Sequence, residues 1–572
     1  MEHREKMTLM ALLLIVVLAA GFRLYDIQGY PGGLFPDEAA NGEDALLVLD
    51  GDIRPFYPRG NGREGLYFFL EALSIKTFGI GVWQLHLVSA LIGVATVAAM
   101  YFATRPWFGR LAGLIAALLL ATNHWHVTMS RTGFRAILIP LAVALFTAWV
   151  GYTISAVKKK KTRASYIYAA LAGAALAGGF YTYIAYRVMI GVVLGILFFM
   201  FLAGLHPKIG FPHGKRYWRQ LVVGLLAGLI VLLPLIIFFA GDPAAFVGRA
   251  GQVSIFNKDL QLEFGGGALA GTLLYSLRET LYSFFGGTGD LNWRHNVAGF
   301  PLLNPLTGVL FLLGLSWAIN GVVLVFYKIV AGKELHLGMI YPYLLLLISG
   351  FLVPIITTAE GIPHGLRSIG LIVPIFLLAG TAGAVAWRWV EKFLTPLKLR
   401  AVGIGVGIGL VVLALAYDGT LYFVFARNDS EAHYDYRTDL TDVSNYLNTY
   451  HREQPAAPRP YLVLEGFSLQ SVHFLTSVSA HEYLKDDGVH PDVDEHIWRV
   501  IDPGRSHLTK LQPGELIIFT QSTMADADRY QRAQGDNIEL LETRSNRFNQ
   551  EIMRIYRGVP GEVLGSTSDL DA

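Results

Sequence analysis

The chain contains eleven apolar segments, each close to the length that a helix needs to cross a lipid bilayer, about 20 residues. Because no water satisfies backbone groups inside lipid, such segments fold as helices. Charged residues make up only 16% of the chain, against about 25% in soluble proteins. These features predict a polytopic all-α membrane protein. Its expected spans lie at about 7–22, 83–104, 111–128, 136–157, 165–182, 186–205, 220–240, 302–327, 338–357, 364–387 and 401–425.

Lys and Arg in the short loops predict the direction of these spans. With the N-terminus inside, the basic run Lys158–Lys161 and later Lys328 and Arg388 all fall on the inner side, as the positive-inside rule requires. Loops 23–82 and 241–301 then face outward. The first span follows a basic start and can also be read as a cleaved signal peptide, which leaves the later spans unchanged. We expect a multi-pass protein of the inner or plasma membrane.

The C-terminal region alternates polar stretches with short apolar runs. This pattern predicts a small extracytoplasmic α/β domain over 428–560. Residues 438–450 are typical of a polar helix. The last residues, 561–572, have the composition of a disordered tail. The predicted domains are therefore a transmembrane domain at 1–427, the soluble domain and the tail. Short buried strands are expected at 461–464, 515–519 and 551–556, where β-branched and aromatic residues cluster.

Loop 241–301 contains an apolar stretch, Ala268–Phe285, that is interrupted by Arg278 and Glu279. Counting it as a span would reverse the direction of all later loops. We expect instead an amphipathic helix in the membrane interface, where it can line the entrance of a long-chain lipid.

Polar side chains concentrate at the outer ends of the spans and are nearly missing from their middles. This pattern disfavours a proton-coupled transporter, which needs ionisable groups at mid-membrane depth. The most informative residues are Asp37 and Glu38, just after the first span, because a carboxylate can hold a cation or take a proton from a hydroxyl. A structural reading remains open for them, since a helix starting near Ala39 would favour acidic residues in its first turn.

Other residues at the outer ends also have structural readings. Arginines at span ends often extend to lipid headgroups. Tyr181 and Tyr183 can form an aromatic belt or flank a sugar or lipid. Asp50-Gly51-Asp52 resembles a metal-binding pair, but Asp-Gly is common in turns, and the turn reading is favoured.

The chain resembles the GT-C superfamily of membrane glycosyltransferases, and in particular the bacterial relatives of protein O-mannosyltransferases and aminoarabinose transferases (glycosyltransferase family 39-like). The resemblance covers about 7–425. It rests on Arg23 and Pro36-Asp37-Glu38 after the first span, the long first outer loop, the eleven spans and the outer soluble tail. The stretches 292–296 (Asn-Trp-Arg-His-Asn) and 363–367 (Pro-His-Gly-Leu-Arg) are similar to motifs of bacterial members.

The resemblance implies a GT-C fold and transfer of a sugar from a polyprenyl-phosphate donor to a hydroxyl on the outer face. The acceptor is a protein, a lipid or a glycan. The family's catalytic base corresponds to Asp37, with Glu38 beside it, and a single base implies inversion at the anomeric carbon. Arginine suits the leaving phosphate; in order of preference the candidates are Arg367, Arg135 or Arg131, and Arg294. Candidate substrate-binding residues are Glu64, His364, Tyr181, Tyr183, His295 and Asn296.

We expect no cofactor and no metal, because the Asp-x-Asp element of the related oligosaccharyltransferases has only Asp50 and Asp52 as a counterpart, further along the loop. No basic tail indicates nucleic acid, and the chain has no cysteine. Two other hypotheses remain: a transporter or flippase of lipid-linked saccharides, and a non-catalytic scaffold of the same fold.

Overall fold

The structure is a computed structural model in which the chain forms two compact units. Unit 1 consists of Met1–Ile27, Ile53–Leu70 and Leu85–Ala432, and unit 2 of Gln28–Asp52, Glu71–Gln84 and His433–Ala572. The predicted tail at 561–572 lies outside the described residues. Those described are 2–205, 212–247, 256, 258–333, 339–358, 361–394, 399–477 and 496–560.

Unit 1 is helical and confirms the expected polytopic class. Among the described residues, 9 helices are long and apolar enough to cross a membrane, and Arg110–Thr122 and Ile340–Ile356 are shorter apolar helices. Each of these matches one of the eleven predicted spans. In chain order the helices are α1 (Glu2–Leu24), α4 (Val82–Phe108), α5 (Arg110–Thr122), α6 (His124–Met129), α7 (Leu138–Lys158), α8 (Thr162–Gly178), α9 (Val188–Gly204), α10 (Pro212–Gly241), α11 (Pro243–Val247), α12 (Lys258–Gly265), α13 (Leu269–Ser283), α14 (Pro305–Val330), α15 (Ile340–Ile356), α16 (Ile372–Leu394) and α17 (Arg400–Thr420).

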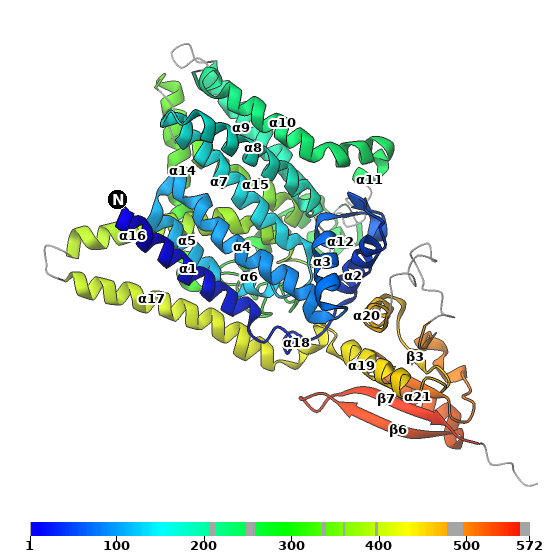
Figure 1. The fold of residues 1–572 in the computed structure, drawn as a ribbon. Coiled ribbons are helices and arrows are strands. Elements are labelled where there is room, and N and C mark those ends of the chain that lie inside the picture. The colour runs from blue at the N-terminus through cyan, green and yellow to red at the C-terminus, as the bar shows by residue number, and fades with distance from the viewer. Residues whose placement is uncertain are drawn as a thin grey trace, which may run out of the picture. The chain divides into compact units, whose positions relative to one another are not determined.

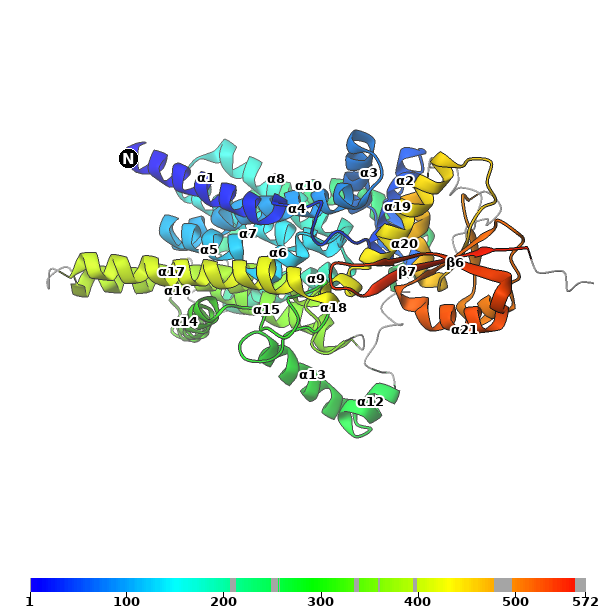
Figure 2. The ribbon, with the colours of Figure 1, turned by 90° about the horizontal axis from the view of Figure 1, so that it is seen from below.

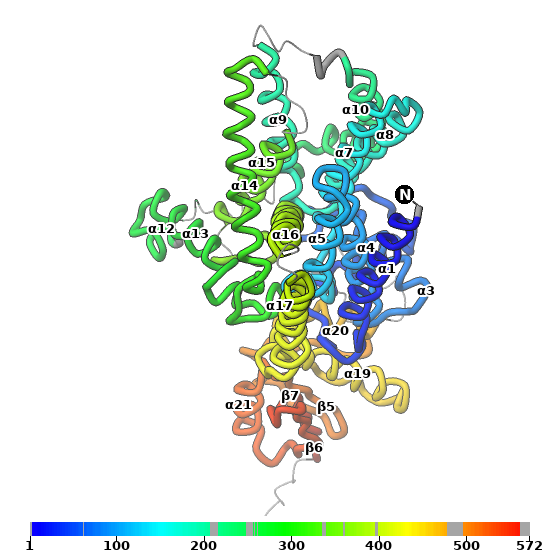
Figure 3. The backbone as a smooth tube through the Cα atoms, turned by 90° about the vertical axis from the view of Figure 1, so that its left-hand side faces the viewer, coloured from blue at the N-terminus to red at the C-terminus, as the bar shows by residue number. Residues whose placement is uncertain are grey.

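Helix α16 forms the centre of unit 1, where Figure 3 shows it end-on between α5 and α14. Small residues permit this close packing. A Cβ added at Gly380 would lie 2.6 Å from the carbonyl oxygen of Ala112 on α5. Without a hydrophobic driving force between helices in lipid, such close backbone approach is a main source of helix association.

Helices α12 and α13 lie to one side of the bundle (Figure 2). Helix α13 covers the predicted amphipathic stretch and confirms that it is helical. Its residues Leu274 and Tyr282 are exposed large side chains, whereas Thr272, Ser276 and Thr280 are buried. The small polar side chains therefore pack inward and the apolar ones point outward, as expected for a helix that contacts lipid.

Unit 2 contains a five-stranded sheet in the order β4-β3-β5-β7-β6, whose long strands β6 and β7 are the red arrows of Figure 1. Strands β4, β3 and β5 are parallel, and β7 pairs antiparallel with both β5 and β6. The predicted strands and the helix at 438–450 are confirmed; β4 and β6 were not predicted. The elements are α19 (Thr438–Glu453), β3 (Tyr461–Val463), α20 (Gly466–Thr476), β4 (Arg499–Ile501), β5 (Leu516–Thr520), α21 (Met524–Gln534), β6 (Ile538–Ser545) and β7 (Glu551–Gly558).

Both faces of this sheet are covered. Leu516 and Ile518 of β5 face a core shared with α19 and α20. Ile517 and Phe519 face the other side, where Tyr530 of α21 packs. Alternate residues of a strand point to opposite faces, so a strand buried on both sides is apolar throughout.

The contact between α8 and α10 gives a test of the packing in unit 1. A Cβ at Gly173 would overlap the carbonyl of Gly224 on the neighbouring helix. We expect Gly173→Ala to destabilise the protein by about 1–3 kcal/mol through overpacking, measured as a lower thermal midpoint in detergent. Gly178→Ala is the matched control on the same helix, because nothing lies within 4 Å of its added Cβ. An unchanged midpoint for Gly173→Ala would contradict this packing.

Candidate functional site

Three short 3-10 segments meet in unit 1, and each brings an arginine. They are η2 (Arg135–Ile137), η4 (Ile184–Arg187) and η6 (Arg367–Leu371). Each one directly precedes an apolar helix, namely α7, α9 and α16. Helix starts carry unsatisfied backbone N–H groups and a partial positive charge, so three of them with their arginines form an environment suited to an anion.

Glu64 lies between two of these arginines. Its carboxylate is 3.4 Å from the Arg187 guanidinium and 4.0 Å from that of Arg135. The short hairpin of β1 (Phe56–Tyr57) and β2 (Arg63–Glu64) places it there. The guanidinium of Arg135 also lies 5.5 Å from the centre of the Tyr183 ring. Arg187 was not among the predicted site residues, because an arginine at the start of a span often contacts lipid headgroups instead.

The predicted residues of the 292–296 and 363–367 stretches also come together. Arg294 lies over the ring of Phe134, 6.0 Å from its centre, and His295 packs edge-on against the same ring. Phe134 immediately precedes Arg135 and therefore joins the two groups. We call Arg135, Arg187, Arg294 and Arg367 the arginine cluster. Two buried carboxylates accompany it: Glu64, which pairs with Arg135 and Arg187, and Asp290.

Asp290 is a buried residue that the sequence analysis did not single out. Its Oδ2 accepts from the His295 ring at 2.9 Å and from the backbone N–H of Gly365 at 2.7 Å, and its Oδ1 accepts from the N–H of Asn292 at 2.9 Å. The His364 ring is 4.0 Å from the same carboxylate. The available signal was its position five residues before His295 in a polar run.

The charge state of this group follows from its neighbours. Burial by itself raises the pKa of Asp290, but the adjacent His295 and His364 rings and the Asn292 N–H outweigh it and lower the pKa to about 2. Burial lowers the pKa of His364 well below its usual value, and His295 and Arg367 lower it further. At neutral pH Asp290 is therefore ionised and the His364 imidazole is neutral.

Three other predicted residues make structural contacts. Arg131 is fully buried and donates to the carbonyls of residues 22, 23, 25 and 26 at the end of α1, and to Tyr422. Its phosphate role stays a prediction that this geometry does not support. The Asn296 amide donates to the carbonyls of Val297 and Phe300. The Tyr181 hydroxyl donates to the carbonyl of Val231 on α10.

The acidic pair lies in unit 2, in the first turn of α2 (Pro36–Leu49). Pro36 occupies the first helical position, where its missing N–H costs nothing. Asp37 is partly exposed, whereas Glu38 is fully buried. The two carboxylates therefore differ in accessibility, and Asp37 is the more exposed of the two.

Helix α2 is attached to α20, which packs on the sheet of unit 2. The Ser471 hydroxyl donates to the carbonyl of Leu34 at 2.7 Å, and the His473 ring pairs with Glu43 at 3.0 Å. Gly42 permits the close approach, since an added Cβ would lie 2.6 Å from the Phe474 ring. The acidic motif is thus held by residues more than 400 positions later in the chain.

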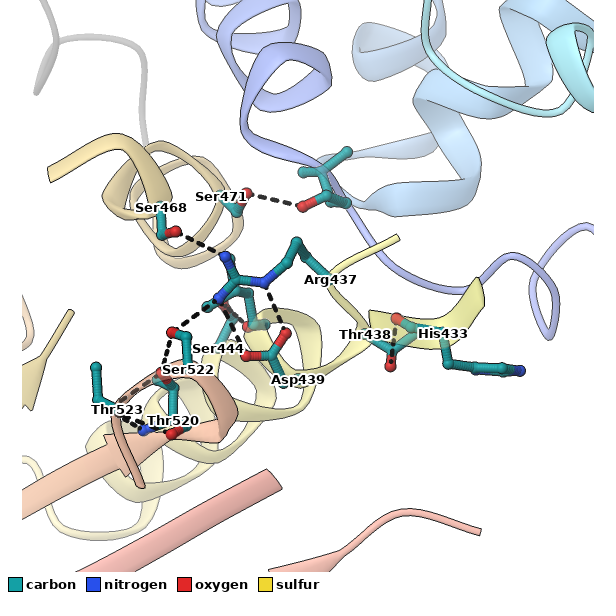
Figure 4. Close-up of polar contacts among 12 residues, drawn as sticks. His433, Arg437, Thr438, Asp439, Ser444, Ser468, Ser471, Thr520, Ser522 and Thr523 are labelled. Atoms are coloured by element: carbon teal, nitrogen blue, oxygen red, sulfur yellow. Dashed lines mark hydrogen bonds and ion pairs between the residues drawn. The ribbon is translucent and has the colours of Figure 1, made fainter. Parts of the chain in front are cut away.

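A buried network in the same unit also supports α20. Figure 4 shows Arg437 donating to both carboxylate oxygens of Asp439, at 3.0 and 3.1 Å, and to the Ser468 hydroxyl at 2.7 Å. Arg437 has a left-handed backbone with φ of 58° at the start of α19. The bidentate ion pair orients the Arg437 guanidinium at the start of α19, and its hydrogen bond to Ser468 links α20 to α19.

Comparison with protein families identifies one match. Residues 66–238 match the family of dolichyl-phosphate-mannose-protein mannosyltransferases. The match confirms the resemblance to this glycosyltransferase family. It covers Arg131, Arg135, Tyr181 and Tyr183, and it leaves Asp37 and Glu38 outside. A search of curated proteins finds no match.

Two solved structures show a partial likeness. ArnT from Cupriavidus metallidurans, bound to undecaprenyl phosphate, is 12% identical with a TM-score of 0.49 over 97% of this chain and 98% of ArnT. The archaeal oligosaccharyltransferase AglB from Archaeoglobus fulgidus, in complex with an inhibitory peptide and a dolichol-phosphate, is 13% identical. Its TM-score is 0.49 over 99% of this chain and 75% of AglB.

The attachment of α2 predicts the effect of a bulkier residue at its contact. We expect Gly42→Val to loosen α2 by about 1–3 kcal/mol, because its side chain would collide with Phe474 and overpacking costs that much. Hydrogen exchange of full-length protein should show faster exchange over 36–49. The control is Gly466→Ala on α20, where nothing lies within 4 Å. If Gly42→Val leaves exchange in α2 unchanged, the contact does not hold the helix.

Proposed function

We propose that this protein is a membrane glycosyltransferase that moves a sugar from a polyprenyl-phosphate carrier to an acceptor hydroxyl on the outer face of the membrane. The arginine cluster is the observation that carries the proposal. Three arginines at the starts of apolar helices, together with Arg294 and two carboxylates, give an excess of positive charge beside the membrane-spanning part. A lipid-linked phosphate fits such a site, because its phosphate is an anion and its apolar chain can lie in the membrane.

The family match supports the same donor class, since the matched family takes its name from a mannose carried on dolichyl phosphate. The sugar in this proposal is a hexose or a pentose. The outer location rests on the distribution of Lys and Arg in the short loops.

Asp37 acts as the base in this proposal. An acceptor hydroxyl becomes a good nucleophile when a carboxylate removes its proton in the transition state. The partial exposure of Asp37 supports this role, and the burial of Glu38 assigns it to positioning within α2. The leaving group is an anionic lipid phosphate that needs no proton from an acid. One base and one displacement give inversion at the anomeric carbon.

Arg367 and Arg294 stabilise the leaving phosphate. The planar guanidinium matches two phosphate oxygens at once, and the negative charge on those oxygens grows as the glycosidic bond breaks. Electrostatic groups that are already in place lower the barrier without reorganising. Arg135 and Arg187 are partly neutralised by Glu64, so they contribute less to phosphate binding and more to the shape of the site.

The role of Asp37 is tested by replacing it with an isosteric residue. We expect Asp37→Asn to lower the transfer rate by about 10²–10⁴-fold, the usual contribution of a general base, with donor binding retained. The measurement is the release of free polyprenyl phosphate from a labelled donor in the presence of acceptor. Asp50→Asn, an exposed residue at the end of the same helix, should keep wild-type activity. Transfer at the wild-type rate by Asp37→Asn would remove Asp37 from catalysis.

The phosphate site is tested through Arg367. Losing one charged hydrogen-bond partner costs about 1.5–3 kcal/mol, so we expect Arg367→Ala to raise the donor KM by about 10–100-fold. Arg367→Lys should recover only part of this, because lysine lacks the planar fork. The exposed Arg278 of α13 supplies the control, Arg278→Ala. A donor KM equal to that of wild type would exclude Arg367 from the phosphate site.

A further inference from the structure

We propose that Asp290, His295 and His364 bind one divalent metal ion of the zinc class. One ligand atom from each of the three lies within 4.8 Å of the others, and all three residues are buried. It is the one such group found among the residues that the structure describes. The proposal stands apart from the donor and from the role of Asp37.

The spacing of the three side chains suits a tetrahedral ion. Zinc binds imidazole nitrogen and carboxylate oxygen at about 2.0–2.2 Å, so two ligands of a tetrahedral site lie about 3.3 Å apart. Asp290 Oδ2 is 2.9 Å from His295 Nδ1 and 4.0 Å from His364 Nδ1. These two distances lie on either side of the required value, and the ligand atoms of His295 and His364 lie within 4.8 Å of each other. Two imidazoles and one carboxylate leave a fourth position open.

His364 supplies the observation that points to a ligand. Its side chain is 8% exposed, and its Nδ1 has no hydrogen-bond partner. That atom lies on the side of the ring that faces Asp290. Buried polar atoms nearly always have a partner, and one without a partner calls for an explanation such as an ion. A metal ion between His364 and Asp290 would satisfy this nitrogen.

Backbone hydrogen bonds already fix the orientation of the Asp290 carboxylate, as a metal ligand requires. Backbone N–H groups of Asn292 and Gly365 donate to the two oxygens of Asp290 at 2.9 and 2.7 Å. Groups that hydrogen-bond to a metal ligand fix its orientation and raise affinity. A Cβ at Gly365 would lie 3.3 Å from Asp290 Oδ2 and 3.1 Å from the carbonyl of His295, so glycine allows the turn to close over the group.

In the competing interpretation, Asp290, His295 and His364 bind no metal and are held together by hydrogen bonding and ring stacking alone. In it, His295 Nδ1 donates its proton to Asp290 and His364 stacks on His295, with ring centres 4.7 Å apart and planes at 19°. That arrangement satisfies His295 and leaves His364 Nδ1 without a partner. When a metal binds, the neutral His295 ring carries its proton on Nε2 instead of Nδ1, so the Nδ1 lone pair bonds to the ion while the Gly365 N–H continues to hold Asp290.

The ion would join two segments that are far apart in sequence. Asp290 and His295 belong to the segment before α14, and His364 to the turn before η6. The same two segments carry Arg294 and Arg367. A bound ion would therefore set the separation of these two arginines, and the positive charge around it would favour an anion or hydroxide in the fourth position.

The test measures metal binding directly on full-length protein, purified in detergent through a tag without a histidine run. After zinc loading and dialysis, elemental analysis should find about one zinc ion per chain. His364→Ala and Asp290→Asn should each lose it. His451→Ala, which changes an exposed histidine of α19, should keep it. Transfer activity is not needed for this readout, so failure of the proposed function leaves the result standing.

A second measurement covers the case in which a variant aggregates. Wild-type protein loaded with Co²⁺ should show the intense visible bands of a tetrahedral nitrogen and oxygen site, and excess zinc should abolish them. The chain has no cysteine, so no thiolate band should appear. Wild-type protein that retains less than about a tenth of an equivalent of zinc, a weak octahedral cobalt spectrum, or full zinc retention by a folded His364→Ala variant would each overturn the proposal.

Discussion

The exclusion of charge from lipid is the constraint on which the rest of this structure depends. An ionised side chain in the middle of a span costs several kcal/mol, so charged groups collect where spans begin and end. In unit 1 the 3-10 segments before α7, α9 and α16 each contribute one arginine of the arginine cluster. The segment before α14 contributes Arg294, together with Asp290 and His295. The arginine cluster forms because the starts of these helices lie next to one another and carry polar residues.

The acidic motif is held in a different way. Helix α2 is part of the unit that contains the sheet, and Ser471, His473 and Phe474 fix it there. The sheet and its helices in unit 2 therefore determine the position of Asp37. A sugar transferase needs its base within hydrogen-bond reach of the acceptor hydroxyl, and a rigid sheet domain is a better support for it than a loop.

Much of the architecture could be predicted from the sequence, because hydrophobic length and periodicity are local signals. The eleven spans, the helix at 269–283 and the buried strand at 516–520 all follow from short stretches. The attachment of α2 to α20 could not be predicted, since it depends on contacts between residues 400 positions apart. The partnership of Asp290 with His364 was missed for the same reason, and β4 and β6 were missed because Arg499–Ile501 is short and the polar residues of Ile538–Ser545 weaken a strand pattern.

The central claim is that the chain transfers sugar and does not merely carry a lipid-linked one across the membrane. The most direct measurement follows donor and acceptor together in detergent micelles, where no two leaflets exist between which a lipid could move. Purified protein with a polyprenyl-phosphate sugar and a hydroxyl acceptor should release free lipid phosphate and form glycosylated acceptor in equal amounts, with inverted anomeric configuration. No consumption of donor across a panel of sugars and acceptors, by protein that still binds the lipid phosphate, would contradict the account.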